Sequence, residues 1–460
     1  MESCMKKFTI NGNESTAVKG SLIFEVTDEP EQLEITFEVD NPAWIQIFVK
    51  NDSDEVGQAL LTHQQRERII RVGKENSLSS PTITPQKNLE GEWEVSFIAK
   101  PYFPESAVVT IQVKELRQGI VDPENEMDIF DEESKGKKGW VKGDLHTHTH
   151  FSDGQMSRSE NLVSAKNQQL DFFFATEHNL IVRQWPRDDE VLIFPGIELT
   201  SDVLGHCNYL GVMSNLFSED DYEKLADEAG MLDLLRQNKH NGLLSINHPY
   251  LKPWEWNTDL PLNLVTSLEV INDPTYQDNT EATKEAFDLW SRLWNKGVKI
   301  TGVGGSDSHL RPDDFYPGAT SPSLIGDPGT YVYVEELNLS NVLDAIKNGH
   351  TKISRIGEIY LSSKDKPNIL PGEQLSSSVK HFKVSLPNGS KNYTVDWVLD
   401  GEVVRSENTS VTSEIQIEEL DDQFHWLRAD VWEGNEIVAT FNPVYWNDKK
   451  PEITMLKEVL

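Results

Sequence analysis

Residues 143–154 read GDLHTHTHFSDG and place three histidines and an aspartate directly after a short apolar run. His146 and His148 are two residues apart, and residues at this spacing point to the same side of an extended chain. Asp307 and His309 repeat the spacing after a later apolar run, VKITGVGG. Imidazoles and carboxylates paired in this way are common metal ligands, so both stretches predict metal binding at the ends of strands.

The sequence around these stretches predicts an α/β fold. From about residue 140 to residue 372, short apolar runs alternate with longer segments of helical periodicity. Such repetition is typical of a buried parallel sheet, either open or closed into a barrel. Because the carboxyl ends of parallel strands share one face, side chains that follow the runs converge there. The side chains in question are His146, His148, Asp153, Glu177, His178, Glu198, His206, His248, Asp307 and His309.

The donor set without Glu177 contains six imidazoles, three carboxylates and no thiolate. Mixed nitrogen and oxygen ligands suit Zn, Mn or Fe as divalent ions. Nine ligands exceed the needs of one ion and fit two or three. Three such ions would leave a site charge of about +3, which attracts anions and suits a phosphate ester attacked by activated water.

The regions on either side predict β-structure. Residues 1–120 alternate apolar and polar residues in short runs separated by turn-formers, as in an N-terminal β-sandwich. Residues 121–139 are charged and lack periodicity, which predicts an acidic linker. The metallohydrolase domain would span residues 140–372, and residues 373–460 predict a smaller, Ig-like β-sandwich. We expect the metal chemistry to be separable from both sandwiches.

Charge and composition exclude several functions. The net charge of −34 argues against binding to duplex nucleic acid or to an anionic membrane surface. The two cysteines, Cys4 and Cys207, are far apart and offer no disulfide framework. The N-terminus has no apolar signal region, and no apolar run reaches the ~20 residues of a membrane span. These features predict a cytoplasmic protein that acts on a small molecule.

The motifs resemble those of the polymerase and histidinol phosphatase (PHP) superfamily over about residues 140–360. The resemblance lies in DLHTHTHFSDG, ATEHN, GIELTS followed by GHCNYLG, INHP and GGSDSH. The β-rich flanks are similar to those of its CehA/McbA-like branch. The resemblance implies a distorted (β/α)7 barrel with a trinuclear metal site. It assigns one ion to His146, His148, Glu198 and Asp307, a second to Glu198, His206 and His248, and a third to Asp153, His178 and His309.

The leading hypothesis is a phosphoesterase in which a metal-bridging hydroxide attacks an anionic ester. Glu198 would bridge two ions, and Glu177 or His150 would protonate the leaving group. Glu177 stands where the superfamily usually has Asp. This change beside the ligand His178 puts in doubt a role of Glu177 in supporting a ligand or transferring a proton, but not metal binding. Arg183 and Arg355 are candidate phosphate clamps, although ordinary structural roles are the more expected reading for both.

Two alternatives remain. The same metals would also hydrolyse a carboxyl ester or a carbamate, and a pocket with apolar walls and no cationic clamp would favour that reaction. The aromatic segment YLKPWEWN, residues 250–257, points in this direction. The other alternative is a non-catalytic binding protein stabilised by metal, in which coordination is closed and no position is left for water.

Overall fold

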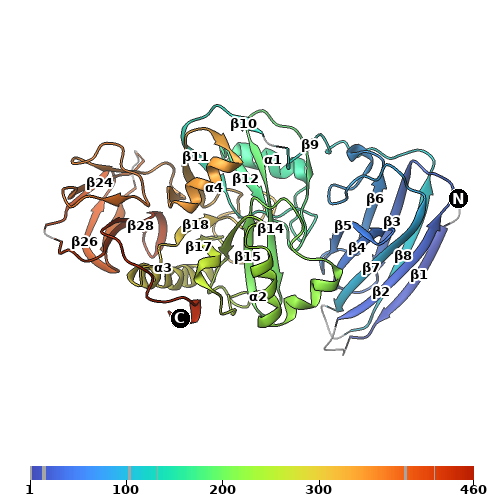
Figure 1. Ribbon diagram of the computed structural model, residues 1–460. Helices are drawn as coiled ribbons and strands as arrows, with labels where there is room; N and C mark the ends of the chain where they lie inside the picture. Colours follow the sequence, from blue (N-terminus) through green and yellow to red (C-terminus); the bar gives the residue numbers. More distant parts are fainter. Residues whose placement is uncertain are drawn as a thin grey trace.

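The computed structural model describes residues 3–12, 17–101, 105–131, 133–387, 391–418 and 420–459. Figure 1 shows an elongated molecule with three regions in a row. The N-terminal sheets lie at one end, the middle region with the helices follows, and the C-terminal sheets lie at the other end.

Two four-stranded antiparallel sheets form the N-terminal region, which we call the N-terminal sandwich. The first sheet has the order β1 (Ser3–Ile10), β8 (Ala107–Leu116), β3 (Gln32–Val39) and β6 (Glu67–Gly73). The second has the order β2 (Val18–Val26), β7 (Gly91–Pro101), β4 (Ala43–Asn51) and β5 (Asp54–Leu61). Their facing side chains, among them Phe37, Ile47 and Trp93, are fully buried in one hydrophobic core. The alternating sequence pattern therefore marks the inner faces of the two sheets.

One large mixed sheet runs through the middle region. Its strand order there is β18 (Thr301–Gly305), β17 (Val265–Asn272), β16 (Leu243–Ile246), β15 (Gly205–Leu210), β14 (Leu192–Ser201), β12 (Phe172–Ala175), β11 (Gly139–Asp144), β19 (Gly329–Val334) and β21 (Thr351–Ser354). The pairs β11/β12, β12/β14, β16/β17 and β17/β18 are parallel. The pairs β14/β15, β15/β16, β11/β19 and β19/β21 are antiparallel, which differs from the expected parallel sheet.

Helices are fewer than a regular β/α alternation requires. The described residues form four α-helices, α1 (Arg158–Asn167), α2 (Glu228–Gln237), α3 (Asn279–Asn295) and α4 (Leu339–Lys347). They also form the short 3-10 helices η1 (Asn76–Leu78), η2 (Glu219–Ala226), η3 (Leu262–Leu264) and η4 (Leu456–Glu458). Only three residues separate β14 from β15, which is too short for a helix and makes an antiparallel hairpin instead. A closed (β/α)7 barrel therefore stays a prediction, while a mixed, sheet-rich fold is what the structure has.

Residues 121–139 pack against the middle region. Strand β9 (Met127–Asp128) pairs with β13 (Gln184–Trp185), and β10 (Ser134–Lys135) pairs with β20 (Leu337–Asn338). Met127 and Ile129 are buried in a core shared with α1 and β12. This charged segment thus has contacts along its length that its composition did not predict.

The large sheet continues into the C-terminal region through pairing of β21 with β29. The further strands are β29 (Glu436–Phe441), β28 (His425–Glu433), β25 (Tyr393–Leu399), β26 (Glu402–Thr409), β30 (Val444–Trp446) and β23 (Gln374–Leu375). A separate three-stranded sheet consists of β22 (Tyr360–Ser363), β24 (His381–Ser385) and β27 (Thr412–Gln416). The two sheets share a core that includes Phe382, Trp397 and Trp446.

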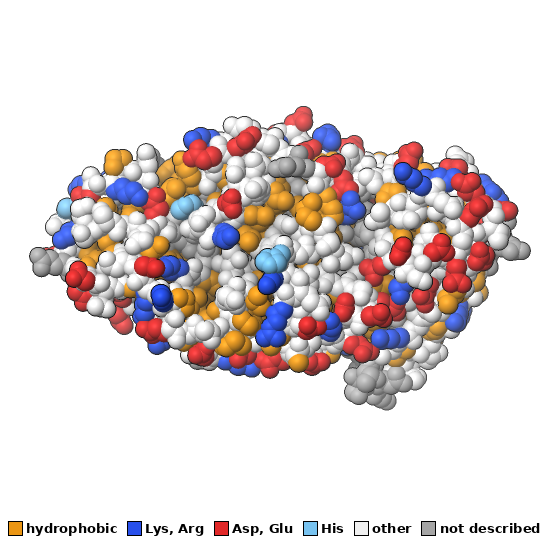
Figure 2. Space-filling model, viewed as in Figure 1, with side chains coloured by type: hydrophobic (Ala, Val, Ile, Leu, Met, Phe, Trp, Pro, Cys, Tyr) orange, Lys and Arg blue, Asp and Glu red, His pale blue; other side chains and the backbone are white. Residues whose placement is uncertain are grey.

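Charged side chains of both signs are spread over the face shown in Figure 2, without a broad basic stretch. None of the helices formed by the described residues has the length and apolarity needed to cross a membrane.

Candidate metal centre

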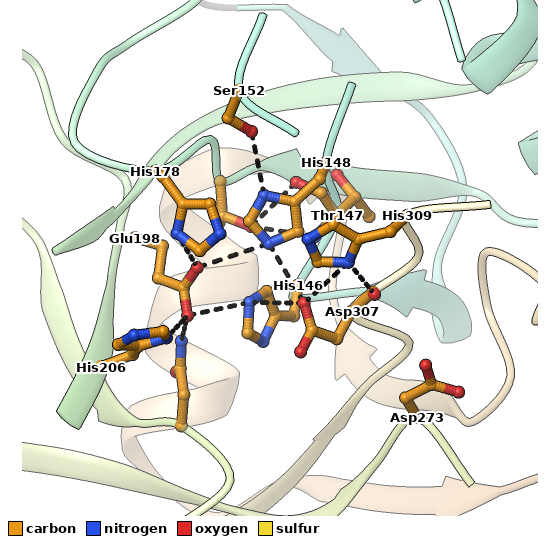
Figure 3. A network of polar contacts seen from close by, with 12 residues as sticks. His146, Thr147, His148, Ser152, His178, Glu198, His206, Asp273, Asp307 and His309 are labelled. Atoms are coloured by element: carbon orange, nitrogen blue, oxygen red, sulfur yellow. Dashed lines mark hydrogen bonds and ion pairs between the residues drawn. The ribbon is translucent and has the colours of Figure 1, made fainter. Parts of the chain in front are cut away.

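All nine predicted metal ligands meet at one edge of the large sheet. Each has a side-chain atom within 3.6 Å of a side-chain atom of another predicted ligand. Figure 3 shows seven of these side chains pointing toward one another: His146, His148, His178, Glu198, His206, Asp307 and His309. His206 begins an antiparallel strand and Glu198 lies within β14, so the hairpin brings the amino end of β15 to the same edge as the carboxyl ends of parallel strands.

Thr147 fixes the local conformation of the His146–His148 pair. Its hydroxyl donates to the carbonyl of Phe174 at 2.8 Å, and its backbone N–H donates to the hydroxyl of Thr176 at 2.9 Å. Thr147 also bridges in parallel to Ser308 beside β18. With Thr147 held on one side, the two imidazoles on the other side face the cluster, as alternation on an extended chain predicts.

Glu198 lies at the centre of the cluster. Its Oε1 is 3.2 Å from His146 Nε2 and accepts hydrogen bonds from His206 Nδ1 at 3.1 Å and Asn247 Nδ2 at 2.8 Å. Its Oε2 is 2.7 Å from His178 Nδ1. The two oxygens thus face different imidazoles, as a carboxylate placed between two ions would (Figure 3).

Two further carboxylates each lie between two imidazoles of the cluster. Asp307 Oδ1 is 3.3 Å from His146 Nε2 and 3.1 Å from His148 Nε2. Asp153 Oδ1 is 3.3 Å from His178 Nε2 and 3.1 Å from His309 Nε2. The backbone of Asp307 has φ 49° and that of His248 has φ 24°, so both residues adopt left-handed conformations at the ends of strands. Such strained residues cluster at functional sites.

Buried polar atoms without hydrogen bonds show that the residues fit metal ions. His146 Nε2 and His148 Nε2 are buried and have no hydrogen-bond partner among the described residues. Carboxylate oxygens lie 3.1 to 3.4 Å from these two atoms, but not in hydrogen-bonding geometry. A buried polar atom left without a partner is costly, and a cation between the imidazoles and carboxylates would satisfy it.

Three groups of side chains each place their donor atoms within 4.8 Å of one another. They are His148, Asp153, His178 and His309; His146, His148 and Glu198; and His178, Glu198 and His206. His248 is outside these groups, and its Nε2 lies 3.6 Å from Glu198 Oε1. The groups share His148, His178 and Glu198, so the donor atoms form one continuous cluster.

Burial and mutual proximity set the charge states. Burial, together with the neighbouring imidazoles of His309 and His178, lowers the pKa of His148 to about 3, so its Nε2 lone pair is free. Burial would raise the pKa of Glu198, but His178 and the other imidazoles hold it well below its usual range. Glu198 and His148 are therefore in the forms that bind metal, an ionised carboxylate and a neutral imidazole. For His146, His178 and His309, burial lowers the pKa, but the neighbouring carboxylates outweigh it and raise the pKa above its usual value.

Glu269 on β17 belongs to the centre and was missed in the sequence. It is buried, its Oε1 lies 3.2 Å from His146 Nδ1, and its Oε2 accepts the backbone N–H of His248 at 2.9 Å. A carboxylate on the far nitrogen of a histidine orients the ring for metal binding. The available signal was a lone charge inside the apolar run TSLEVI.

Glu177 is adjacent to the cluster but faces a loop. Its carboxylate accepts the backbone N–H groups of Thr149 at 2.9 Å and Ser152 at 3.1 Å, and the hydroxyls of both residues. Burial raises its pKa, while the donors from Ser152 and Thr149 lower it. His150 Nδ1 lies 3.2 Å from the carbonyl oxygen of Met156. Neither Glu177 nor His150 lines the cavity that opens over the cluster.

A cavity of about 620 Å³ opens over the cluster. Its walls include the aromatic side chains of Trp44, Trp254, Tyr276 and Tyr316. Among the described residues that line it, Lys100 is the one Lys or Arg. Lys100 pairs with Asp202 at 2.7 Å. Arg183 and Arg355 do not line the cavity; they pair with Asp128 and Asp327, respectively.

Burial raises the pKa of Cys207, which leaves the thiol protonated.

Asp273 also lines the cavity and stands apart from the ion-pair network in Figure 3. Its carboxyl accepts the hydroxyl of Thr275 at 2.7 Å and is 4% exposed. Burial, together with the negative charge of Asp307, raises the pKa of Asp273 to about 6. The cavity thus contains one carboxyl that holds a proton more readily than an ordinary aspartate.

No protein-family model and no curated protein matches the sequence. Among solved structures, the chain is similar to a two-domain protein from Bacteroides vulgatus that contains a predicted PHP-like metal-dependent phosphoesterase. The identity is 15%, the match covers 70% of this chain and 99% of that one, and the TM-score is 0.37. It is also similar to PsfC from Pseudomonas syringae, at 16% identity over 43% of this chain and 83% of that one, with a TM-score of 0.28. Structural similarities this distant carry no functional argument.

Proposed function

We propose that the protein is a metal-dependent hydrolase of the PHP type, and that its substrate is an anionic phosphate ester. The observation that carries the proposal is the convergence of nine donor side chains with unpartnered Nε2 atoms of His146 and His148 beneath a cavity. A purely structural role would not need an open cavity above the donors, since structural metal sites are closed.

Two or three divalent ions, Zn, Mn or Fe, would be held by the nine donors. Glu198 would lie between two of the ions, and Asp307 and Asp153 would complete the sets around His148 and His309. When bound, the ions would supply a Lewis acid and an activated water as nucleophile. Three such ions would carry a charge of about +6 against the four carboxylates of Asp153, Glu198, Glu269 and Asp307, and this excess would attract a phosphate group.

The chain's own residues have distinct tasks in this proposal. Glu269 holds Nδ1 of His146 and so turns Nε2 toward the centre. Asp273 is placed on the cavity wall to hold a proton for the leaving group. Glu177, with both oxygens occupied by the Thr149–Ser152 backbone and hydroxyls, fits a positioning role better than proton transfer.

A carboxyl ester or carbamate is the second candidate substrate. The aromatic walls favour it, and the single lysine of the cavity is already paired with Asp202. A metal centre that activates water attacks carbonyl carbon as well as phosphorus. The balance of charge at the cluster still favours the phosphate ester.

The test is a hydrolysis screen of full-length protein purified without chelator and supplied in turn with Zn, Mn or Fe. The substrates are p-nitrophenyl phosphate, bis(p-nitrophenyl) phosphate and p-nitrophenyl acetate. The proposal expects metal-dependent turnover of a phosphate ester that is lost with chelator. Turnover of the acetate alone would support the second candidate, and full metal content without any turnover would support a binding protein.

A further inference from the structure

The loop His150–Asp153 carries one of the proposed metal ligands. Asp153 Oδ1 reaches His178 Nε2 at 3.3 Å and His309 Nε2 at 3.1 Å. Ser152 Oγ lies 3.3 Å from Nδ1 of His148. The position of this short loop therefore sets where Asp153 lies and how the ring of His148 is turned.

The middle region holds one side of the loop. Glu177 accepts the backbone N–H of Ser152, and Ser152 also donates its backbone N–H to the carbonyl of Thr149 at 3.2 Å. Both contacts bind the N–H group of Ser152.

The N-terminal sandwich holds the carbonyl side. On β6, Arg68 is buried and donates to the carbonyls of His150 at 2.9 Å and Phe151 at 3.1 Å. Gln65, just before β6, donates to the carbonyls of His150 at 2.8 Å and Ser152 at 3.2 Å. Gln65 also accepts a 2.6 Å hydrogen bond from Arg68. All three carbonyls of residues 150–152 thus bind donors that come from another region of the chain.

We infer that Arg68 is a positioning residue that, together with Gln65, fixes the Asp153 loop, so that the N-terminal sandwich is part of the metal centre. The inference rests on the proposed metal-dependent function. Arg68 and Glu177 place opposite charges on the two sides of the loop, and charge-assisted hydrogen bonds are stronger than neutral ones. Without Arg68, loop carbonyls lose buried donors, and Asp153 is no longer held in place.

The same sandwich also supplies part of the cavity wall. Trp44, His63, Gln64 and Lys100 line the cavity, and the Trp44 ring meets the His178 ring edge-on at 5.6 Å. These contacts oppose the expectation that the metal chemistry is separable from the N-terminal region. A sandwich that only accompanied the middle region would not reach a proposed metal ligand with a side chain.

The experiment is a Co²⁺ titration of the full-length, metal-stripped protein, followed by its visible absorption spectrum. Arg68→Gln should weaken the binding of one Co²⁺ ion by roughly tenfold to hundredfold, the range typical for lost partners of metal ligands, and should alter the spectrum of that ion. Arg68→Lys keeps the charge but lacks the planar guanidinium that donates to two carbonyls at once. It should therefore recover part of the affinity that Arg68→Gln loses. Arg71→Gln is the matched control, because Arg71 lies on the same strand and pairs with Glu34 at 3.0 Å; it should bind like the wild type.

Gln65→Leu keeps the test decisive if Arg68→Gln does not fold, because Gln65 is only half-buried. It should weaken the same ion several-fold. Wild-type affinity and stoichiometry in Arg68→Gln, or in Gln65→Leu where Arg68→Gln is unfolded, would overturn the positioning role while leaving the proposed function intact. Failure of the wild-type protein itself to bind Co²⁺ would overturn both.

Discussion

At the scale of single residues, four histidines of the centre have a protein partner at Nδ1 and a carboxylate of the cluster beside Nε2. The nitrogen held by the protein is Nδ1 in His146 (Glu269, 3.2 Å), His148 (Ser152, 3.3 Å), His178 (Thr200, 2.6 Å) and His309 (Asp307 carbonyl, 2.7 Å). Partners of this kind fix the ring orientation and its tautomer. The Nε2 atoms of these rings are thereby turned toward the carboxylates of the cluster.

Glu269 tests this arrangement directly. Glu269→Gln keeps the size of the side chain but removes the charge that holds His146, and should lower affinity for divalent metal about tenfold. Metal titration of the stripped protein measures it. Glu285→Gln, an exposed glutamate on α3, is the control and should leave affinity unchanged. Equal affinities in the two variants would remove Glu269 from the centre.

Asp273 predicts a pH dependence of stability. Its pKa is raised from 3.8 to about 6, so the folded chain binds this proton more tightly than the unfolded chain. Stability from this group is therefore full below pH ~4 and falls until the pH passes ~6, by about 3 kcal/mol in all. Asp273→Asn has no such loss, so its stability relative to wild type should rise between pH 4 and pH 7. Urea unfolding of both proteins in chelator measures this; a difference independent of pH would contradict the assignment.

Residue spacing predicted which side chains meet, but not how each one is oriented. The nine donors could be named because they follow apolar runs, and strand ends in a sheet share an edge. Glu269 was not predicted because it lies inside an apolar run. A charged residue in that position does not indicate that its side chain reaches the ends of the other strands. The direction of Glu177 depends on Thr149 and Ser152, and the sequence does not show that the loop folds back onto it.

At the scale of elements, β18 is built from small residues because the centre lies against it. A Cβ on Gly305 would stand 2.3 Å from Glu269 Oε1 and 2.4 Å from the Cβ of His146. Gly302 faces Trp290 in the same way, with a Cβ placed 2.5 Å from the ring. The glycine-rich sequence TGVGG thus serves close packing, and it predicts no nucleotide site.

Gly305→Ala should accordingly displace Glu269 or His146 and lose metal affinity while the rest of the fold remains. We expect a loss of at least tenfold, measured by metal titration and supported by an unchanged far-UV circular dichroism spectrum. Gly136→Ala is the control, since a Cβ there meets no atom within 4 Å. Wild-type affinity in Gly305→Ala would show that β18 can accommodate a Cβ at this position without displacing Glu269 or His146.

The types of most elements could be predicted from periodicity, whereas their pairing could not. Helices α1, α3 and α4 overlap segments of helical periodicity in the sequence, at 157–170, 280–297 and 341–350. The apolar runs that form β14 and β15 did not predict that the two strands are antiparallel. The hydrophobic pattern of a buried strand is the same in either direction. The hairpin becomes evident only from the three-residue connection and the pairing of Thr200 with His206.

At the scale of the whole molecule, the middle and C-terminal regions share one sheet and one core. Pairing of β21 with β29 crosses the boundary expected near residue 372, and Trp426 packs against Trp294 with ring centroids 6.1 Å apart. Trp426 Nε1 also donates to Asn295 at 2.8 Å. We therefore expect these two regions to unfold together.

Trp426→Ala should destabilise that joint unit by about 3–5 kcal/mol, as expected for a fully buried aromatic residue. Differential scanning calorimetry should show the transition that releases metal moving to lower temperature. If the C-terminal region unfolded at a lower temperature while the temperature of metal release stayed the same, the two regions would not unfold together.

We propose that one cluster around Glu198 binds several metal ions. The most direct measurement is elemental analysis of full-length protein reconstituted with Zn, Mn or Fe, made alongside Glu198→Gln. The wild type should hold more than one transition-metal ion per chain. Glu198→Gln should lose metal and hydrolyse the best substrate about 10³-fold more slowly, or ~4 kcal/mol in the barrier. Less than one ion per wild-type chain after reconstitution, or an unchanged rate in Glu198→Gln, would contradict the account.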